Sequence, residues 1–358
     1  MQIDEFQVRK DDLSKSRFAK REAGALQPDE VLFKVERFGL TANNITYGVV
    51  GDKFGYWNFF PAEDGWGIIP AWGIAEVIET KHSDVKIGER VYGYFPMASH
   101  LKIKAGKAVP WRVVDVAEHR AGLAPVYNNY ARLGAEPGYD RALDEERMAL
   151  LPLYATSYCL YDFLLDNKWF GAEQALIPSA SSKTSIGLAY ALRDDESAPT
   201  SVGVTSAKNL GAVKDLALYD QVVAYDAFRT IDAGRPAVIV DMSGNGKFLS
   251  DLHAHLGDNM KFCSTVGVTH WDAAAAGPGF NRERTQFFFA PGHIQKRVAD
   301  WGPGEFEKRA HKFWREAAIK SRGWLTIERF DGARALEKIF HELRSGKVSP
   351  DRAIVAAL

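Results

Sequence analysis

The sequence predicts an α/β protein of two domains, an antiparallel β barrel followed by a doubly wound parallel sheet. Short strands separated by Gly, Pro and Asp turns fill roughly the first 95 residues, as in antiparallel barrels. Between about residues 150 and 268, apolar runs alternate with helical stripes, as in right-handed β-α-β units. A length of 358 residues is sufficient for two separate cores.

The strands of the first part follow a period of two. Residues 31–39, VLFKVERFG, alternate Val31, Phe33 and Val35 with charged side chains such as Lys34, which predicts a half-buried strand. Residues 68–95 continue in the same style around the turn-rich segment KHSDVKIGER. We therefore expect antiparallel pairing here.

The second part contains buried strands that alternate with helices. A helix is expected over 150–165, and helical stripes follow at 186–192, about 207–218, 248–256 and 305–322. Strands are expected at 173–180, 200–206, 221–226, 237–244 and 261–268. Continuous apolar strands between helices indicate a parallel sheet that is covered on both faces.

Composition narrows the classes of partner. The net charge of −1 argues against a nucleic-acid or anionic-membrane binder, because both need a concentrated cationic surface. The apolar stretch 149–161 is too short to cross a bilayer, and residues 1–10 lack the apolar segment of a secretory signal. Only Cys159 and Cys263 are present, too few for a disulfide framework. The expectation is a cytoplasmic protein that acts on a small molecule.

The first strand-to-helix turn of the parallel sheet is PSASSKTSIG, residues 178–187. Its small serines allow backbone to approach a pyrophosphate, Lys183 adds a cation, and Gly187 allows the helix to pack closely on its strand. It is not G-x-G-x-x-G, and Ile177 and Ser182 occupy the two glycine positions of a nucleotide-hydrolysing P-loop. A purely structural polar loop is the other alternative.

The end of the second strand indicates which dinucleotide binds. NAD-specific sheets usually carry an acid there, which bonds the ribose hydroxyls. This chain has Thr205, Ser206 and Lys208 instead. Two hydroxyls and a cation suit a 2′-phosphate, so the sequence favours NADP(H) over NAD(H). A solvated lysine with no ligand is the alternative for Lys208.

Several stretches together resemble a known family. In order they are GLTANNITYGVVGD (39–52), PAWGIAEVIETKHSDVKIGERVYGY (70–94), LIPSASSKTSIGLAYAL (176–192), SVGVTSAKNLGAV (201–213), VIVDMSGN (238–245), STVGVTH (264–270) and ELRSGKVSPDRAI (342–354). The chain resembles the zinc-free quinone-oxidoreductase-like branch of the medium-chain dehydrogenase/reductase superfamily, and more closely the DUF2855 proteins. The resemblance implies a GroES-like β-barrel domain of residues 1–153 and 291–358, and a Rossmann domain of residues 154–290. It also implies a coenzyme cleft between them and a homodimer.

The resemblance also implies which residues hold the coenzyme. Ser181, Ser182 and Lys183 would meet the pyrophosphate, and Thr205, Ser206 and Lys208 the phosphate on the adenosine ribose. The remaining expected contacts are Thr156 near the phosphates or nicotinamide, Ser243 on the adenosine side, and Val266, Gly267 and Phe288 beside the nicotinamide.

A catalytic zinc is not expected. In zinc-dependent relatives a Cys and a Gly-His-Glu motif bind the metal, but the corresponding residues 70–73 read PAWG and residues 41–44 read TANN. Another electrophile must then stabilise negative charge on the substrate oxygen. In zinc-free relatives the loop matching 41–47 does this, so Tyr47 is the expected donor, with Asn44 and Thr41 orienting the carbonyl or the carboxamide of the coenzyme. A core tyrosine and loop-forming asparagines are the alternatives.

Aromatic residues are unusually dense between Phe54 and Trp72, where the sequence reads FGYWNFFPAEDGWGIIPAW. No strand or helix period explains them. A lid over a flat or bulky apolar substrate is one interpretation, and a satellite core or a subunit contact is the other. The expected substrate contacts are Tyr56, Trp57, Phe60, Trp72 and Tyr127.

The function expected from these features is an NADPH-dependent, zinc-independent reductase. Hydride would pass to an activated C=C bond (an enone) or to a quinone. Two alternatives remain open: a zinc-free NADP-dependent ketone or aldehyde reductase, and a non-catalytic NADPH-binding protein.

Overall fold

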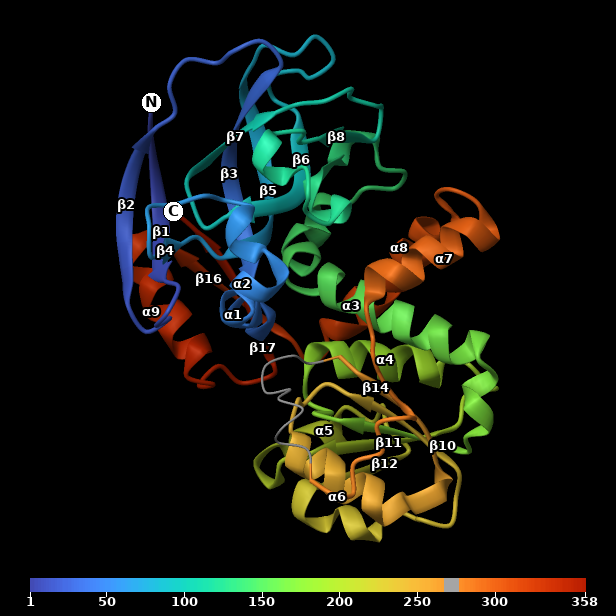
Figure 1. Cartoon of the computed structure of the whole chain (residues 1–358). Coiled ribbons are helices and arrows are strands. Elements are labelled where there is room, and N and C mark those ends of the chain that lie inside the picture. Colours follow the sequence, from blue (N-terminus) through green and yellow to red (C-terminus); the bar gives the residue numbers. More distant parts are fainter. Residues whose placement is uncertain (267–276) are drawn as a thin grey trace. The chain divides into compact units, whose positions relative to one another are not determined.

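The computed structural model describes residues 1–266 and 277–358 and divides into two compact units (Figure 1). Residues 1–149 and 325–358 form the first unit, and residues 150–324 form the second. Residues 291–324 therefore belong to the second unit, whereas the sequence analysis assigned them to the barrel domain. The reason is packing: the rings of Phe306 and Phe313 lie 5.6 and 5.7 Å from that of Tyr158, within the second unit.

The first unit is built on an eight-stranded, mainly antiparallel sheet. Its long central strand β3 pairs with β5 on one side, and with both β7 and β17 on the other. The strands are β16 (Thr326–Asp331), β17 (Arg352–Ala357), β3 (Glu30–Leu40), β5 (Pro70–Thr80), β6 (Arg90–Pro96), β9 (Asn129–Arg132), β8 (Arg112–Val114) and β7 (His100–Lys104). The strands expected at 31–39 and within 68–95 are thus confirmed.

A smaller antiparallel sheet and three helices complete this unit. Strand β1 (Gln2–Arg9) lies between β2 (Ser16–Glu22) and β4 (Trp66–Gly67). The helices are α1 (Ala42–Val49), α2 (Gly51–Phe54) and α9 (Ala333–Arg344). Residues 41–47 were expected as a loop, but Thr41 and Asn44 form a capping box that begins α1.

The second unit contains a six-stranded parallel sheet in the order β12-β11-β10-β13-β14-β15. This order runs outward from β10 in both directions, as in a dinucleotide-binding Rossmann fold. The strands are β10 (Gln174–Pro178), β11 (Thr200–Thr205), β12 (Gln221–Ala224), β13 (Ala237–Asp241), β14 (Met260–Thr265) and β15 (Thr285–Phe287). The first five were expected, whereas β15 was not.

Helices cover both faces of this sheet (Figure 1). Helices α3 and α4 lie on one face, and α6 packs on the other through Phe248, Leu249 and Leu252. The helices are α3 (Asp144–Asp166), α4 (Lys183–Arg193), α5 (Leu210–Asp215), α6 (Gly246–Leu256), α7 (Ala290–Trp301) and α8 (Glu305–Ser321). The antiparallel sheet of the first unit and this parallel sheet confirm the expected fold class.

Short 3₁₀ turns link these elements. They are η1 (Tyr56–Asn58), η2 (Glu118–Arg120), η3 (Pro125–Asn128), η4 (Leu133–Ala135), η5 (Arg141–Leu143), η6 (Lys168–Gly171), η7 (Ala207–Asn209), η8 (Tyr225–Thr230) and η9 (Gly257–Asn259).

Helix α3 runs through Pro152 and is longer than the expected segment 150–165. The stretch Arg141–Asp166 is apolar and long enough to cross a membrane by composition, yet 56% of its most apolar window is buried inside the protein. Core helices pass the same test, so this is weak evidence for a membrane span.

Candidate functional site

A crevice of about 500 Å³ opens at the carboxyl ends of the strands in the second unit. Ser179, Tyr225 and residues 242–247 line it. Ser179 follows β10, and residue 242 follows β13. These are the neighbouring strands at which the chain order reverses, and ligands of open α/β sheets bind at this point.

The loop from β10 to α4 is held by one hydrogen bond at the start of the helix and by two bonds to other segments. Ser179 adopts a φ of 63°, the left-handed region that glycine adopts most easily. Its backbone N–H donates to the Tyr225 hydroxyl at 2.8 Å. The Ser182 hydroxyl caps α4 by accepting from Ser185 N at 3.2 Å. The Ser181 hydroxyl accepts from Asn209 Nδ2 at 3.1 Å.

These bonds distinguish the three residues that were expected to meet a pyrophosphate. Ser182 donates its hydroxyl hydrogen to Ser185 Oγ at 2.8 Å, so its side chain supports the helix end. Ser181 accepts a bond and keeps its own O–H for another acceptor. Lys183 is the first residue of α4, where the helix dipole favours an anion.

The three residues expected at the adenosine phosphate follow one another at the end of β11. Thr205 is buried, Ser206 is half-buried and Lys208 is exposed. Along the sequence, no acid follows this strand before Asp215 at the end of α5. The carboxylate that usually bonds the ribose hydroxyls is therefore replaced by hydroxyls and an exposed ammonium.

Ser243 lies in a turn that Asp241 holds. One carboxylate oxygen of Asp241 accepts from Ser243 N at 3.0 Å and from Ser243 Oγ at 2.6 Å, and the other accepts from Gly244 N at 3.1 Å. Burial raises the pKa of Asp241, and these bonds oppose that effect. Asn245 then caps α6 by accepting from Phe248 N. The crevice wall is thus rigid.

The residues expected beside the nicotinamide are only partly described. Val266 follows β14, and its N–H donates to Asp241 O at 2.9 Å. Phe288 follows β15, and its N–H donates to Thr265 O at 2.9 Å. The Phe288 side chain is buried, with its ring 5.5 Å from that of Phe163. Gly267 lies outside the described residues.

Thr156 and Gly187 mark where α3 and α4 meet. The Thr156 hydroxyl donates to Pro152 O within α3 at 3.1 Å. A Cβ on Gly187 would lie 2.5 Å from Ser157 Oγ and 2.7 Å from Tyr154 Cδ1. The close approach expected at Gly187 is therefore present, but it is made to α3 and not to the preceding strand.

Tyr47 lies on α1 in the first unit and is 5% exposed. Its hydroxyl oxygen accepts from Asn43 Nδ2 at 2.7 Å. Burial raises the pKa of this phenol well above its ordinary value, and neighbouring Tyr56 adds to the effect. Tyr47 therefore carries a neutral hydroxyl, and the side chains of Trp72 and Tyr94 also lie within hydrogen-bonding reach of it.

The side chain of Asn44 makes hydrogen bonds to backbone groups of Thr41 and Pro70. Asn44 Oδ1 accepts from Thr41 N at 2.7 Å, and its Nδ2 donates to Pro70 O at 2.9 Å. Both ends of this amide are occupied in fastening α1 to β5. Asn43, which the sequence analysis did not select, donates the hydrogen bond to the Tyr47 hydroxyl.

The expected substrate contacts separate into a buried and a half-buried group. Trp57 and Phe60 are 3% and 5% exposed, in the core of the first unit. Tyr56, Trp72 and Tyr127 are half-buried and pack against that core. The Tyr56 ring lies 4.5 Å from Tyr47, and the Tyr127 ring 5.9 Å from Trp72. Trp57 and Phe60 thus belong to the main core of the first unit, and neither the lid nor the satellite-core interpretation describes them.

Residues 70–73 form the start of β5 and pair with β6. Among the described residues, no group of three or more His, Cys, Asp or Glu side chains is placed to hold a metal ion.

Three residues at the crevice were missed from the sequence. Tyr225 closes one side, Asn209 orients Ser181, and Asp241 holds the Ser243 turn. Asp241 ends a buried strand in the motif VIVDMSGN, which was a usable signal. Tyr225 and Asn209 make hydrogen bonds to Ser179 and Ser181, which are far from them in the sequence. No local sequence pattern therefore indicates these two residues.

The fold is shared with several solved structures of low sequence identity. CurA from Vibrio vulnificus matches with a TM-score of 0.63 and 12% identity, covering 100% of this chain and 98% of that chain. The CurK enoyl reductase matches with a TM-score of 0.60, 14% identity and 99% coverage of both chains. An Etr1p mutant in complex with NADP and crotonyl-CoA matches with a TM-score of 0.57, 11% identity and 100% coverage of both.

At these identities the matches establish a shared fold and nothing further. No curated protein matches the chain in sequence. The model of the family described as protein of unknown function (DUF2855) matches residues 38–349. Because that match spans most of the sequence, the chain belongs to the DUF2855 family.

Proposed function

We propose that this protein is an NADP(H)-dependent, zinc-independent reductase of an activated C=C bond or a quinone. The observation that carries the proposal is the crevice at the β10/β13 switch point, next to a second strand that ends in Ser206 and Lys208 without an acid. A crevice at this point suits a dinucleotide, and the replacement of the acid suits a 2′-phosphate.

The residues around the crevice fit the donor pattern that NADP(H) needs. The Ser181 hydroxyl, held by Asn209, and the first turn of α4 would bind the pyrophosphate. Ser206 and Lys208 would bind the phosphate on the adenosine ribose. Tyr225 and Ser243, which line the crevice, would contact the adenosine.

Tyr47 would hold the proton that the reaction needs. When bound, the coenzyme supplies a hydride. A substrate carbonyl conjugated to the reduced bond gains negative charge, which a neutral hydroxyl stabilises by donating a hydrogen bond. Asn43 donates to the Tyr47 oxygen, and the Tyr47 hydroxyl hydrogen would make the bond to the substrate.

Two further observations support the reaction and substrate class. Solved structures of the same fold include an enoyl reductase, a complex with NADPH, and a complex with NADP and crotonyl-CoA. Around Tyr47, the half-buried Tyr56, Trp72 and Tyr127 present aromatic surface, which favours a bulky or aromatic substrate. The alternatives are a ketone or aldehyde reductase and a non-catalytic NADPH-binding protein.

We also propose a cytoplasmic homodimer. Both cysteines are free and buried, consistent with a reducing compartment. Strand β15 ends the described sheet, and its last residue, Phe287, is 43% exposed. An unpaired edge of this kind favours pairing with a second copy. Fractionation of cells and light scattering of the purified protein test the two statements.

The activity is tested by pairing each enone with its saturated ketone. Oxidation of NADPH is followed at 340 nm with both compounds and with a quinone. Turnover of the enone or quinone without turnover of the saturated ketone supports the proposal. Turnover of the saturated ketone without turnover of the enone or quinone supports a carbonyl reductase. Tight NADPH binding without oxidation across the panel would leave a binding protein.

A further inference from the structure

Three hydrogen-bond donors from three different elements surround the Tyr47 hydroxyl in the first unit. Asn43 lies four residues before Tyr47 on α1, and its Nδ2 donates to the Tyr47 oxygen at 2.7 Å. Residues four apart on a helix are neighbours on one face, so the helix itself places this donor. The side chains of Trp72 and Tyr94 also lie within hydrogen-bonding reach of the same hydroxyl.

The sheet of the first unit holds Trp72 and Tyr94 next to each other. They are directly opposite in the register of β5 and β6, so their side chains lie on the same face. Their rings are 5.2 Å apart, and the Tyr94 ring is 5.7 Å from that of Tyr47. Asn44 Nδ2 donates to Pro70 O at the start of β5. This bond fastens α1 to the strand that carries Trp72.

The hydroxyl of Tyr94 is fully buried. Among residues 1–266 and 277–358, no group meets it at full hydrogen-bond geometry. A buried hydroxyl without a partner is unfavourable, because its bonds to water are lost on folding. Burial raises the pKa of the Tyr94 phenol, and the contact with Tyr47 raises it further, as expected of the donor in this pair. A bond to the Tyr47 oxygen would therefore satisfy the Tyr94 hydroxyl.

The three donors oppose the effect of burial on Tyr47. Burial raises the pKa of the Tyr47 phenol, and neighbouring Tyr56 adds to this effect. The contacts with Trp72, Tyr94 and Asn43 act in the opposite direction. A hydrogen bond is stronger when its acceptor oxygen is charged, so the donors stabilise the phenolate more than the phenol. Without them, a buried phenol would hold its proton more tightly.

We infer that the three donors around Tyr47 are positioning residues, which let its hydroxyl give a proton to the substrate. This inference rests on the proposed function. Once hydride has reached the conjugated bond, the Tyr47 O–H bond breaks and its electron pair stays on the phenol oxygen. A new O–H bond forms on the substrate oxygen, giving an enol that rearranges to the saturated carbonyl compound. The donors stabilise the phenolate until water returns a proton to it.

The first test measures the donors without coenzyme or substrate. A trifluorinated tyrosine, whose phenol ionises at lower pH than that of tyrosine, replaces Tyr47 in the full chain, and fluorine NMR follows its ionisation against pH. Asn43→Leu, Trp72→Phe and Tyr94→Phe should each raise its pKa by about 1, because each removes one bond to the charged form. Thr46→Val removes a hydroxyl that is bonded within α1, and this control should leave the pKa unchanged. An unchanged or lower pKa in any donor variant that folds would overturn the inference.

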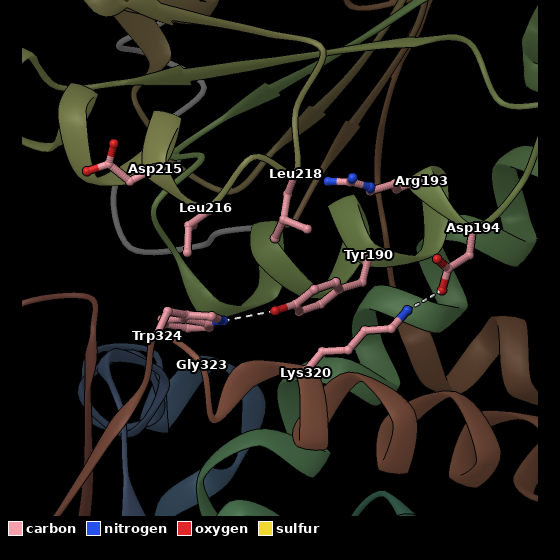
Figure 2. Close-up of a pocket in the computed structure, with 9 residues that line it drawn as sticks. All are labelled: Tyr190, Arg193, Asp194, Asp215, Leu216, Leu218, Lys320, Gly323 and Trp324. Carbon is pink, nitrogen blue, oxygen red and sulfur yellow. Dashed lines mark hydrogen bonds and ion pairs between the residues drawn. The ribbon is translucent and has the colours of Figure 1, made fainter.

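The second test measures turnover with the natural Tyr47. Asn43→Leu and Tyr94→Phe should lower kcat for an enone by about three- to tenfold, since a proton transfer senses part of a tenfold change in acidity. The KM for the enone and the Kd for NADPH should stay unchanged. Tyr190→Phe is the control, because Tyr190 is a buried phenol of the second unit whose hydroxyl accepts from the Trp324 indole at 2.9 Å (Figure 2). Equal losses of kcat in Tyr190→Phe and Tyr94→Phe would overturn the inference.

The two tests separate this inference from the proposed function. Absence of NADPH oxidation by the wild type would refute the proposed function, and the fluorine NMR titration would still decide whether the donors act on Tyr47. Turnover by the wild type, together with an unchanged pKa or an unchanged kcat in Asn43→Leu, would refute the inference alone.

Discussion

The Tyr225 hydroxyl oxygen lies 2.8 Å from the backbone nitrogen of Ser179 and accepts its hydrogen bond. Tyr225 follows β12, whereas Ser179 follows β10. One hydrogen bond therefore joins the segments that follow two different strands of the parallel sheet. Both residues line the crevice. The position of the loop that would receive a pyrophosphate therefore depends on a phenol from a different β-α unit.

Replacing this phenol should affect both stability and coenzyme binding. Tyr225→Phe removes the acceptor for the Ser179 N–H, a loss of about 1 kcal/mol in the free energy of unfolding. If the loop then moves, the Kd for NADPH should rise by about fivefold, because a fivefold change in Kd corresponds to about 1 kcal/mol of binding free energy. Tyr161→Phe is the control, because its hydroxyl donates to Asp195 on the surface. Equal NADPH affinities of the two variants would contradict this role.

The backbone of Ser179 offers a stabilising substitution. With a φ of 63°, serine is held in a conformation that glycine adopts without steric cost. Ser179→Gly should raise the free energy of unfolding by about 0.5–1 kcal/mol, and urea denaturation measures it. Ser179→Ala keeps the steric cost and should give no gain. A gain with alanine equal to that with glycine would rule out strain as the cause.

Packing between α3 and α4 should reject any side chain at position 187. A Cβ there would lie 2.5 Å from Ser157 Oγ, so Gly187→Ala should lower the free energy of unfolding by about 1–3 kcal/mol. Gly211 is the control, since a Cβ there meets no atom within 4 Å. Gly211→Ala should be neutral or slightly stabilising. Thermal unfolding measures both variants. Equal losses of stability in Gly187→Ala and Gly211→Ala would contradict the packing argument.

Tyr47 should affect turnover far more than coenzyme binding. Tyr47→Phe removes the proposed hydrogen-bond donor and should lower kcat by about 100-fold while the Kd for NADPH stays unchanged. Burial raises the pKa of this phenol, so it stays protonated where an ordinary tyrosine, with a pKa near 10, begins to ionise. Wild-type kcat should therefore show no fall from this group up to about pH 10. A fall near pH 9–10 that disappears in Tyr47→Phe would contradict the raised pKa.

The sequence predicted the parallel sheet well, because each buried strand is a continuous apolar run bounded by small or polar residues. Strand β15 was not predicted, because TQF is short and largely exposed and contains no apolar run. Residues 41–47 were expected as a loop because the resemblance to zinc-free relatives implies one there. The capping box of Thr41 and Asn44 turns the same residues into the start of α1.

The candidate site was predictable where it depends on local order along the chain. Ser181, Ser206 and Lys208 follow the ends of strands, and period and spacing are sufficient to find them. The roles of Tyr225, Asn209 and Asn43 depend on which side chain reaches which atom. The role of Ser182 could not be predicted from the spacing of residues either, because its hydroxyl is bonded to Ser185 at the start of α4.

The central claim is that Ser206 and Lys208 select a dinucleotide that carries a 2′-phosphate. Fluorescence titration of the wild type and of Lys208→Glu with NADPH and NADH tests it most directly. The wild type should bind NADPH at least about tenfold more tightly than NADH, as expected for one charge-assisted bond, and Lys208→Glu should lose this preference. Equal affinities of the wild type for the two coenzymes, or a preference that survives Lys208→Glu, would contradict the claim.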